Sequence, residues 1–148
     1  MSKVTDKKIF IASDHAGYDL KSKICTFLTN QKIEVLDLGT ESPLESVDYP
    51  DFAKKLTKEL SKDSSAVGIL ICGSGIGISI AANREKYIRA ALCINEEMAR
   101  LSRIHNDANV LCLGARLIDE SDALNAVNMF LNTEFEKGRH VTRVQKLS

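Results

Sequence analysis

A cysteine precedes a glycine-rich loop near the middle of the chain, in the run CGSGIG at 72–77. Glycines let a backbone come close to a ligand, and a helix that begins in such a loop points free N–H groups at a bound anion. The same positive field favours the thiolate form of a neighbouring cysteine. Cys72 is therefore a candidate base or nucleophile beside an oxyanion site. The alternative is a small apolar residue buried at the end of a strand.

Two familiar glycine loops do not match this spacing. A dinucleotide-binding loop has the pattern GxGxxG, but after Gly73 and Gly75 the third glycine is Gly77, one position too early. That loop also follows the first strand of its fold, whereas this one follows the third predicted strand. A phosphatase loop of the low-molecular-weight type places an arginine six residues after its cysteine, where this chain has Ile78. The spacing argues against both.

Two pairs of polar residues stand at the ends of predicted elements. Asp14 and His15 follow the first predicted strand, and His105 and Asn106 end a predicted helix. A lone histidine is more often a hydrogen-bonded structural residue than a catalytic one, and both roles remain open here. The three histidines and four cysteines show no CxxC, HxxxH or HExxH spacing, so the sequence predicts no metal site.

The C-terminal tail, 134–148, is predicted to form a docked helix or an arm. If it is helical, Arg139, His140 and Arg143 share one face, and two guanidinium groups at this spacing suit one phosphate. The alternative is a solvated helix end, where basic residues also complement the helix dipole. From Lys137 onward the chain has no acidic residue.

Strand-like and helix-like segments alternate along the chain. Continuously apolar runs predict strands at 9–13, 33–38, 66–72, 89–94 and 110–113. Helical spacing of apolar residues predicts helices at 18–30, through 52–60, from the glycine loop to about 83, at 95–105 with Asn95 as N-cap, and at 121–132. This alternation predicts one doubly wound, Rossmann-like α/β domain over 1–148, with about five parallel strands, helices on both faces and a C-terminal helical arm. In such sheets ligands bind beyond the carboxyl ends of the strands.

The overall composition excludes several classes of partner. The chain has 148 residues, 44% of them hydrophobic, and its 20 basic residues balance 20 acidic ones. Binding to nucleic acid or to a membrane surface relies on an excess of basic residues, so neither partner is predicted. The polar segment 1–8 and the longest uncharged run, 66–82, predict neither a secretory signal nor a membrane span. Four cysteines without a CxxC pair are typical of free thiols in the cytoplasm.

Six segments, in order over nearly the whole chain, resemble one family: the type B ribose-5-phosphate isomerases, with their allose-6-phosphate and galactose-6-phosphate isomerase relatives. The segments are SDHAG at 13–17, LDLGT at 36–40, DYPDFA at 48–53, ILICGSGIGISIAAN at 69–83, SRIHNDANVLCLGAR at 102–116 and GRHVTRV at 138–144. Each is a modest signal alone, but the six in sequence are specific. The resemblance implies interconversion of ribose 5-phosphate and ribulose 5-phosphate, a step of the non-oxidative pentose phosphate pathway. It further implies an enediolate intermediate and no metal or organic cofactor.

The resemblance also implies catalytic roles. Cys72 takes the place of the base that moves a proton between C2 and C1 of the sugar, and Ser74 stands where the family has a hydroxyl that assists proton transfer at the sugar oxygens. His105, with Asp14 nearby, matches the residue that opens the furanose ring. Some family members lack the cysteine and use a glutamate a few residues further along the chain. That position is Ile78 here, so the chain resembles the cysteine subtype.

The remaining matched positions bind substrate in the family. The expected anion hole for the enediolate consists of the 73–79 backbone, with Gly73, Gly75, Gly77 and Ser79, together with Asn106; the expected phosphate ligands are His15, Arg116, Arg139 and Arg143; and Tyr49 lines the sugar site. The family forms homodimers or tetramers whose sites are shared between chains. One chain is then expected to supply the Cys72 loop with 14–15, and the other chiefly His105, Asn106, Arg116 and the tail arginines.

Two alternatives remain open at this point. An allose-6-phosphate or galactose-6-phosphate isomerase would share all of this chemistry and differ in the length of its pocket. A flavodoxin-like phosphate-binding module without turnover would explain the fold and the glycine loop, but it would give Cys72, His105 and Asn106 no joint role.

Overall fold

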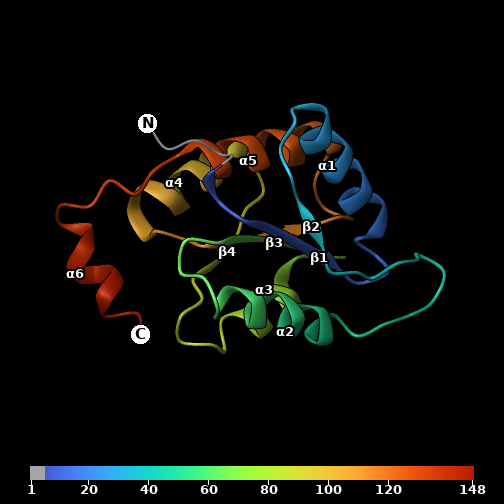
Figure 1. The fold of residues 1–148 in the computed structure, drawn as a ribbon, viewed down its shortest axis with the longest axis horizontal. Coiled ribbons are helices and arrows are strands. Elements are labelled where there is room, and N and C mark those ends of the chain that lie inside the picture. The colour runs from blue at the N-terminus through green and yellow to red at the C-terminus, as the bar shows by residue number, and fades with distance from the viewer. Residues whose placement is uncertain (1–5) are drawn as a thin grey trace.

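Five parallel strands form one sheet in the computed structural model, which describes residues 6–148 (Figure 1). The strands are β1 (Ile9–Ser13), β2 (Leu36–Asp37), β3 (Val67–Cys72), β4 (Ala90–Leu92) and β5 (Val110–Gly114), in the order β2-β1-β3-β5-β4. All four neighbouring pairs are parallel. The predicted parallel sheet is therefore confirmed. The part of the polar N-terminal segment before residue 6 lies outside the described residues.

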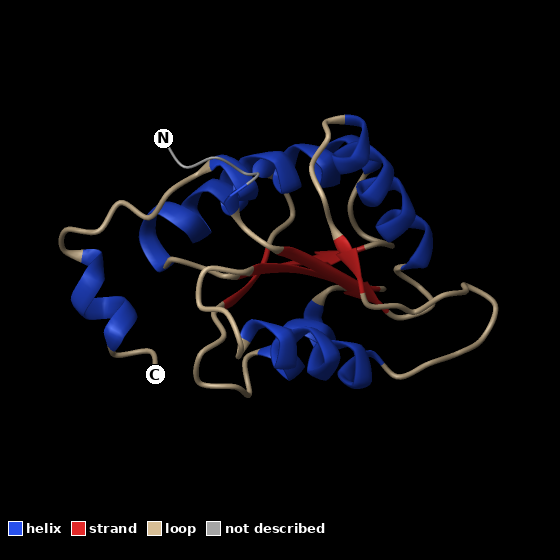
Figure 2. Ribbon diagram, in the orientation of Figure 1, coloured by secondary structure: helices blue, strands red, loops and turns tan. Residues whose placement is uncertain are grey.

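Helices cover both faces of the sheet (Figure 2). One face carries α1 (Tyr18–Asn30), α4 (Glu96–Asn106) and α5 (Glu120–Asn132), and the other carries α2 (Tyr49–Leu60) and α3 (Ile76–Ala82). The last helix, α6 (His140–Gln145), packs against α4 at one end of the molecule and forms the predicted helical arm. Within residues 6–148, no helix is long and apolar enough to cross a membrane.

Local sequence explains where these helices begin. Asn95 accepts a hydrogen bond from the N–H of Met98 at 2.8 Å and so caps α4, as predicted. Asp48 occupies the N-cap position of α2, with Pro50 in the first turn, where its missing N–H costs nothing. In α1, Leu20, Ile24 and Leu28 recur at helical spacing and are buried against the sheet.

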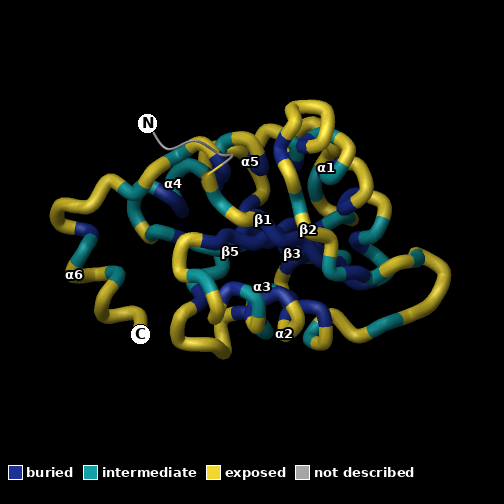
Figure 3. Tube along the Cα trace, viewed as in Figure 1, coloured by how far each residue is buried: buried dark blue, intermediate teal, exposed yellow. Residues whose placement is uncertain are grey.

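The core lies on both sides of the sheet, because the central strands bury side chains on both faces. Every residue of β1, β3 and β5 is buried, as the dark central band in Figure 3 shows. Ile11, Ile69 and Leu111 face α1, α4 and α5, whereas Leu70 and Cys112 face α2 and α3. Continuously apolar strands are the pattern expected of a parallel sheet covered on both faces.

The second strand is much shorter than predicted. The sequence suggested a strand over 33–38, but only Leu36–Asp37 pairs with β1. Lys32 adopts a left-handed conformation with φ of 61°, and the N–H of Ile33 donates to the carbonyl of Leu28, so the chain is still leaving α1 there. Both paired residues are exposed at the edge of the sheet, where an apolar pattern is a weak guide to pairing.

A buried lysine fixes the loop that follows β2. The ammonium group of Lys21 lies 2.7 and 2.8 Å from the two carboxylate oxygens of Asp37, and 2.8 Å from the carbonyl oxygen of Thr40. Hydrogen bonds between Ser13 and residues 39–40 hold the same loop against the end of β1. Lys21 therefore ties α1 to a loop that borders the carboxyl end of the sheet.

Replacing Asp37 with Asn should destabilise the fold, because Lys21 would keep a buried charge with only neutral partners. Breaking a buried ion pair costs about 3–5 kcal/mol, and we expect roughly 2–3 kcal/mol here because the Asp37 side chain is 46% exposed. Urea unfolding measures the loss. As a control, Glu120→Gln removes an exposed partner of Lys23 and should leave the urea midpoint nearly unchanged. Equal midpoints for Asp37→Asn and the wild type would show that the pair does not hold the loop.

Candidate active site

Cys72 is the last residue of β3, and the loop after it folds back onto its thiol. The Sγ atom of Cys72 accepts a hydrogen bond from the N–H of Gly75 at 3.2 Å. Gly75 has a φ of +77°, and a Cβ atom there would lie 2.5 Å from a methyl carbon of Leu92 and 2.8 Å from the carbonyl carbon of Leu113. Only glycine meets both demands. The glycine is what allows an N–H group to point at the sulfur.

An open pocket of about 490 Å³ lies at this edge of the sheet. It gathers seven of the predicted site residues in one place. These are Asp14, Tyr49, Cys72, Gly73, Ser74, Gly77 and Arg116, and the apolar side chains Ile76 and Leu117 complete the lining. The pocket sits where the strand order reverses, since β2 and β3 flank β1 on opposite sides. This is the position at which open α/β sheets bind ligands.

A cation and a phenol flank the glycine loop. A Cβ atom on Gly73 would lie 3.0 Å from Nη1 of Arg116, and one on Gly77 would lie 2.5 Å from the Tyr49 ring. The two glycines therefore allow these side chains to approach the loop backbone closely. Arg116 gives the pocket a permanent positive charge beside the thiol, which suits an anionic ligand.

Several hydrogen-bonding groups of the loop are already engaged, and others are free. The hydroxyl of Ser74 accepts from the N–H of Ile76, which leaves its own proton available. Within residues 6–148, the N–H groups of Gly77 and Ile78 have no acceptor, as is usual in the first turn of a helix. Ser79 differs from the expectation, because its N–H bonds to Gly75 and its hydroxyl to Ile76, so both serve α3.

Asp14 and His15 border the pocket at the end of β1. Asp14 is buried, and its carboxylate accepts the N–H of Gly17 at 3.1 Å, which holds it in place at the start of α1. His15 is half-buried, and its Nδ1 accepts the N–H of Val47 at 3.1 Å. This bond places the proton of the neutral ring on Nε2. It also anchors the long loop before α2.

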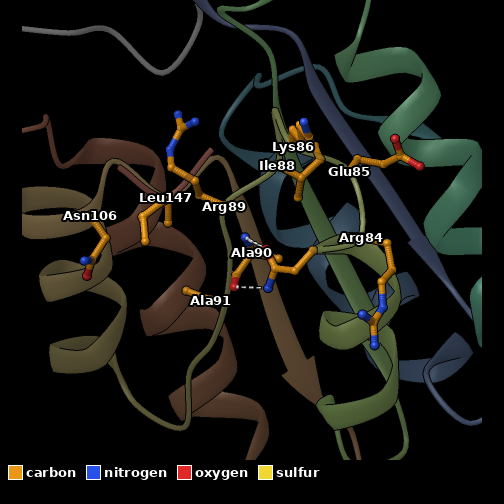
Figure 4. Close-up of a pocket in the computed structure, with 11 residues that line it drawn as sticks. Arg84, Glu85, Lys86, Ile88, Arg89, Ala90, Ala91, Asn106 and Leu147 are labelled. Carbon is orange, nitrogen blue, oxygen red and sulfur yellow. Dashed lines mark hydrogen bonds between the residues drawn. The ribbon is translucent and has the colours of Figure 1, made fainter. Parts of the chain in front are cut away.

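A second group of predicted site residues lies elsewhere. His105, in the last turn of α4, stacks on His140 with ring centroids 4.5 Å apart. Asn106 lines a separate hollow of about 480 Å³, where Figure 4 shows it on the same side as Leu147. Arg139, the N-cap residue of the neighbouring α6, and Arg143 within α6 are both exposed.

The two groups lie at opposite ends of the strands, one at the carboxyl ends and the other near the amino ends. Cys72 pairs with Gly114 at the carboxyl ends of β3 and β5, whereas His105 ends the helix that leads into the start of β5. Strands of this length separate the two edges by roughly 17–20 Å. Within one chain, then, Asp14 does not lie near His105, which agrees with the expectation that the two residues of one site come from different chains. Arg116 differs from the expectation, because it lies with Cys72 and not with His105.

Sequence reasoning did not connect Glu136 or His140 with His105, although it placed His140 on the basic face of the tail helix. Glu136 and His140 stand four residues apart, and the Nε2 of His140 lies 3.2 Å from a carboxylate oxygen of Glu136. The spacing of these two residues was visible in the sequence. Their proximity to His105 was not, because it depends on how α6 packs against α4.

The other three thiols are expected to be unreactive. Burial raises the pKa of Cys93 to about 11, and burial raises the pKa of Cys112 further above its ordinary value. The pKa of Cys25 is raised by burial first and by the nearby Asp37 carboxylate second. Raised values keep these groups as neutral thiols near neutral pH, where they are poor nucleophiles. Of the four thiols, Cys72 is the one that lines this pocket, although the residue is only 4% exposed.

Together these features define a class. A doubly wound sheet that gathers a thiol, an arginine and free backbone N–H groups at its switch point has the features of an enzyme that acts on a small anionic metabolite.

Known proteins place the chain within a family. The model of the ribose/galactose isomerase family matches residues 9–147, and the chain belongs to this family of isomerases. Ribose-5-phosphate isomerase B of Escherichia coli is 42% identical over 142 residues, which cover 96% of this chain and 95% of that protein. The structure of Clostridium thermocellum ribose-5-phosphate isomerase B is 52% identical in sequence, with a TM-score of 0.91. The match covers 95% of this chain and 94% of that one. The Mycoplasma genitalium enzyme, solved with bound ribulose 5-phosphate, is 43% identical, with a TM-score of 0.93 and coverage of 97% and 95%.

Alkylation should distinguish Cys72 from the other thiols. At about pH 8, iodoacetamide is expected to modify Cys72 first, because Cys25, Cys93 and Cys112 have raised pKa values and remain protonated. Peptide mass spectrometry over a time course measures the order. A ligand in the pocket should slow the reaction at Cys72 alone. Modification of Cys25 or Cys93 before Cys72 would contradict this assignment.

Proposed function

We propose that the protein interconverts D-ribose 5-phosphate and D-ribulose 5-phosphate, with Cys72 as the base. The observation that carries this assignment is the pocket at the carboxyl edge of the sheet, where Cys72, Ser74 and Arg116 meet. The bound ribulose 5-phosphate in the Mycoplasma genitalium relative supports the same substrate class. A phosphate-binding module without turnover would not need a thiol held by an N–H group in its pocket.

The proposed reaction moves one proton between two carbon atoms. The thiolate of Cys72 removes the proton from C2 of the open-chain aldose, and the C–H electron pair forms the C1–C2 double bond of an enediolate. The resulting thiol returns the proton to C1, which gives the ketose. Ser74, whose hydroxyl proton is not engaged by the loop, moves a proton between the oxygens on C1 and C2.

Backbone N–H groups stabilise the intermediate. Negative charge develops on the sugar oxygens, and the unengaged N–H groups of Gly77 and Ile78 are available to receive it. The N–H of Gly75 donates to the Sγ atom of Cys72 and holds the sulfur in place at the end of β3. Gly75 therefore contacts the base and not the intermediate. Ser79 acts only by stabilising the first turn of α3, where its N–H and hydroxyl groups are bonded.

Ring opening and phosphate binding require groups from the other edge of the sheet. We assign ring opening to His105 together with Asp14, and we assign Asn106 to the anion hole. His15 and Arg116 supply one set of phosphate ligands, and the tail arginines Arg139 and Arg143 supply another. Because the two edges of one chain are far apart, these groups act together only when two chains associate, so the functional unit is a homodimer or a larger assembly. The free thiols suit a reducing compartment such as the cytoplasm.

Cys72→Ala tests the assignment of the base. Removal of a general base should lower kcat by about 100- to 10,000-fold with little change in folding, since the side chain shortens by one atom. The measurement is the rate of ribulose 5-phosphate formation from ribose 5-phosphate. Cys25→Ala is the matched control, because it removes a half-buried thiol outside the pocket and should keep wild-type turnover.

The outcomes separate the possible assignments. Full activity in Cys72→Ala would remove the base assignment and leave the substrate assignment standing. Faster turnover of allose 6-phosphate or galactose 6-phosphate than of ribose 5-phosphate by the wild type would reassign the substrate within the family. Binding of all three sugars without conversion would favour the non-catalytic module.

Mixing two inactive variants tests the shared site. Cys72→Ala and His105→Ala should each be inactive alone, but re-association of a mixture should restore up to about a quarter of wild-type activity, since about half of the dimers are mixed and each has one intact site. Activity is measured before and after mild dissociation and reassembly. Two copies of Cys72→Ala with different tags serve as the control. No recovery in assembled mixed dimers would show that each chain carries a complete site.

A further inference from the structure

Three potential metal ligands converge where α6 packs against α4. His105 ends α4, His140 begins α6, and Glu136 lies in the segment between α5 and α6. One ligand atom from each of the three residues lies within 4.8 Å of the other two. His105 is distant in the sequence from Glu136 and His140, so the fold is what brings the three residues together.

One of these ligands is a buried nitrogen that has no hydrogen-bond partner among the described residues. His140 is 6% exposed, and its Nε2 is unpaired although a carboxylate oxygen of Glu136 lies 3.2 Å away, because the alignment does not suit a hydrogen bond. A buried polar atom without a partner is costly, and such an atom usually has a function or a missing ligand. A cation between this nitrogen and the Glu136 carboxylate would give the nitrogen a partner.

The charges around the cluster leave room for a cation. Arg100 is the nearby base whose charge reaches Glu136, but both of its hydrogen bonds go to Glu97, at 2.7 Å each. The carboxylate of Glu136 is therefore not neutralised by a bidentate partner of its own. The two imidazoles contribute neutral nitrogen ligands, so the set offers two nitrogens and one negative oxygen.

We propose that His105, Glu136 and His140 form a binding site for one Zn²⁺ ion. Two imidazoles and one carboxylate are a common donor set for zinc, with ligand distances of about 2.0–2.2 Å and an open fourth position. Those distances place tetrahedral ligand atoms roughly 3.3–3.5 Å apart. The 3.2 Å separation between Glu136 and His140 is close to this range, and rotation of the His105 ring would bring its nitrogen toward them.

Zinc at this position would inhibit the enzyme. His105 is the residue to which ring opening is assigned, and a ring nitrogen bound to Zn²⁺ has no lone pair with which to move a proton. This consequence rests on the proposed function, whereas the binding site does not. The ion would act as a reversible inhibitor, and a chelator would restore activity.

Calorimetric titration with ZnCl₂ tests the site, in a Cys72→Ala background that removes the pocket thiol as a competing ligand. Glu136→Gln should weaken Zn²⁺ binding by at least about tenfold, since even loss of an outer-shell partner of a metal ligand costs about 10- to 100-fold. Glu134→Gln is the matched control. Glu134 is exposed and stands two residues before Glu136, so this variant loses the same charge and should still bind Zn²⁺ as the parent does.

Each result decides one point. Equal Zn²⁺ affinity in Glu136→Gln and Glu134→Gln would overturn the site, as would a thiolate charge-transfer band in the Co²⁺-substituted protein. Inhibition is measured separately with otherwise wild-type Cys72, as ribose 5-phosphate turnover with and without ZnCl₂. Loss of inhibition in Glu136→Gln, with turnover retained, supports the site. Zn²⁺ binding by a protein that converts no sugar phosphate would leave the site intact and overturn only the proposed function.

Discussion

All five strands run in the same direction, and this constraint determines where chemistry can occur. Parallel strands bring their carboxyl ends to one edge, so residues that follow β1, β3 and β5 meet although they are distant in the sequence. Asp14 and Arg116 come from the loops after β1 and β5, and Cys72 is the last residue of β3. Apolar strands buried on both faces favour a parallel sheet, and the parallel sheet in turn determines which residues line the pocket.

The same constraint separates the site into halves. Each helix runs back across the sheet, so a helix that ends just before a strand delivers its last residues to the amino edge. His105 and Asn106 occupy that place at the end of α4, and the basic tail continues from the same region. A balanced net charge over the chain thus coexists with a tail that has no acidic residue from Lys137 onward. The proposed function therefore requires that two chains associate, so that this tail reaches the carboxyl ends of the partner's strands.

Sequence reasoning succeeded where local signals and the fold agree. The bounds of β1 and α1 were predicted to the residue, because an apolar run and helical spacing are separated by a polar turn. The strand-end residues could be placed in one pocket once the sheet was known to be parallel. The predicted strand at 33–38 was too long, since its pattern contains no information on the left-handed turn at Lys32.

Contacts between distant helices could not be predicted in this way. The stacking of His105 on His140 depends on the angle at which α6 meets α4, and neither helix encodes that angle in its own periodicity. Similarly, Ser79 matches a site position by type, but its hydrogen bonds within α3 are visible only in three dimensions. Residue type and spacing suggest what a group can do, whereas packing decides what it can reach.

The strand order also has a consequence for folding. β1 pairs with β3 along its whole length, yet α1, β2 and α2 lie between them in the chain. The central pair of the sheet therefore closes a long loop before its contacts stabilise the chain, and such non-local pairing slows folding relative to a helical bundle of similar size. A nascent chain that ends before β3 has no partner for the buried central edge of β1. Until β3 has emerged, the apolar side chains of β1 can be shielded only by α1 and α2 or by other molecules.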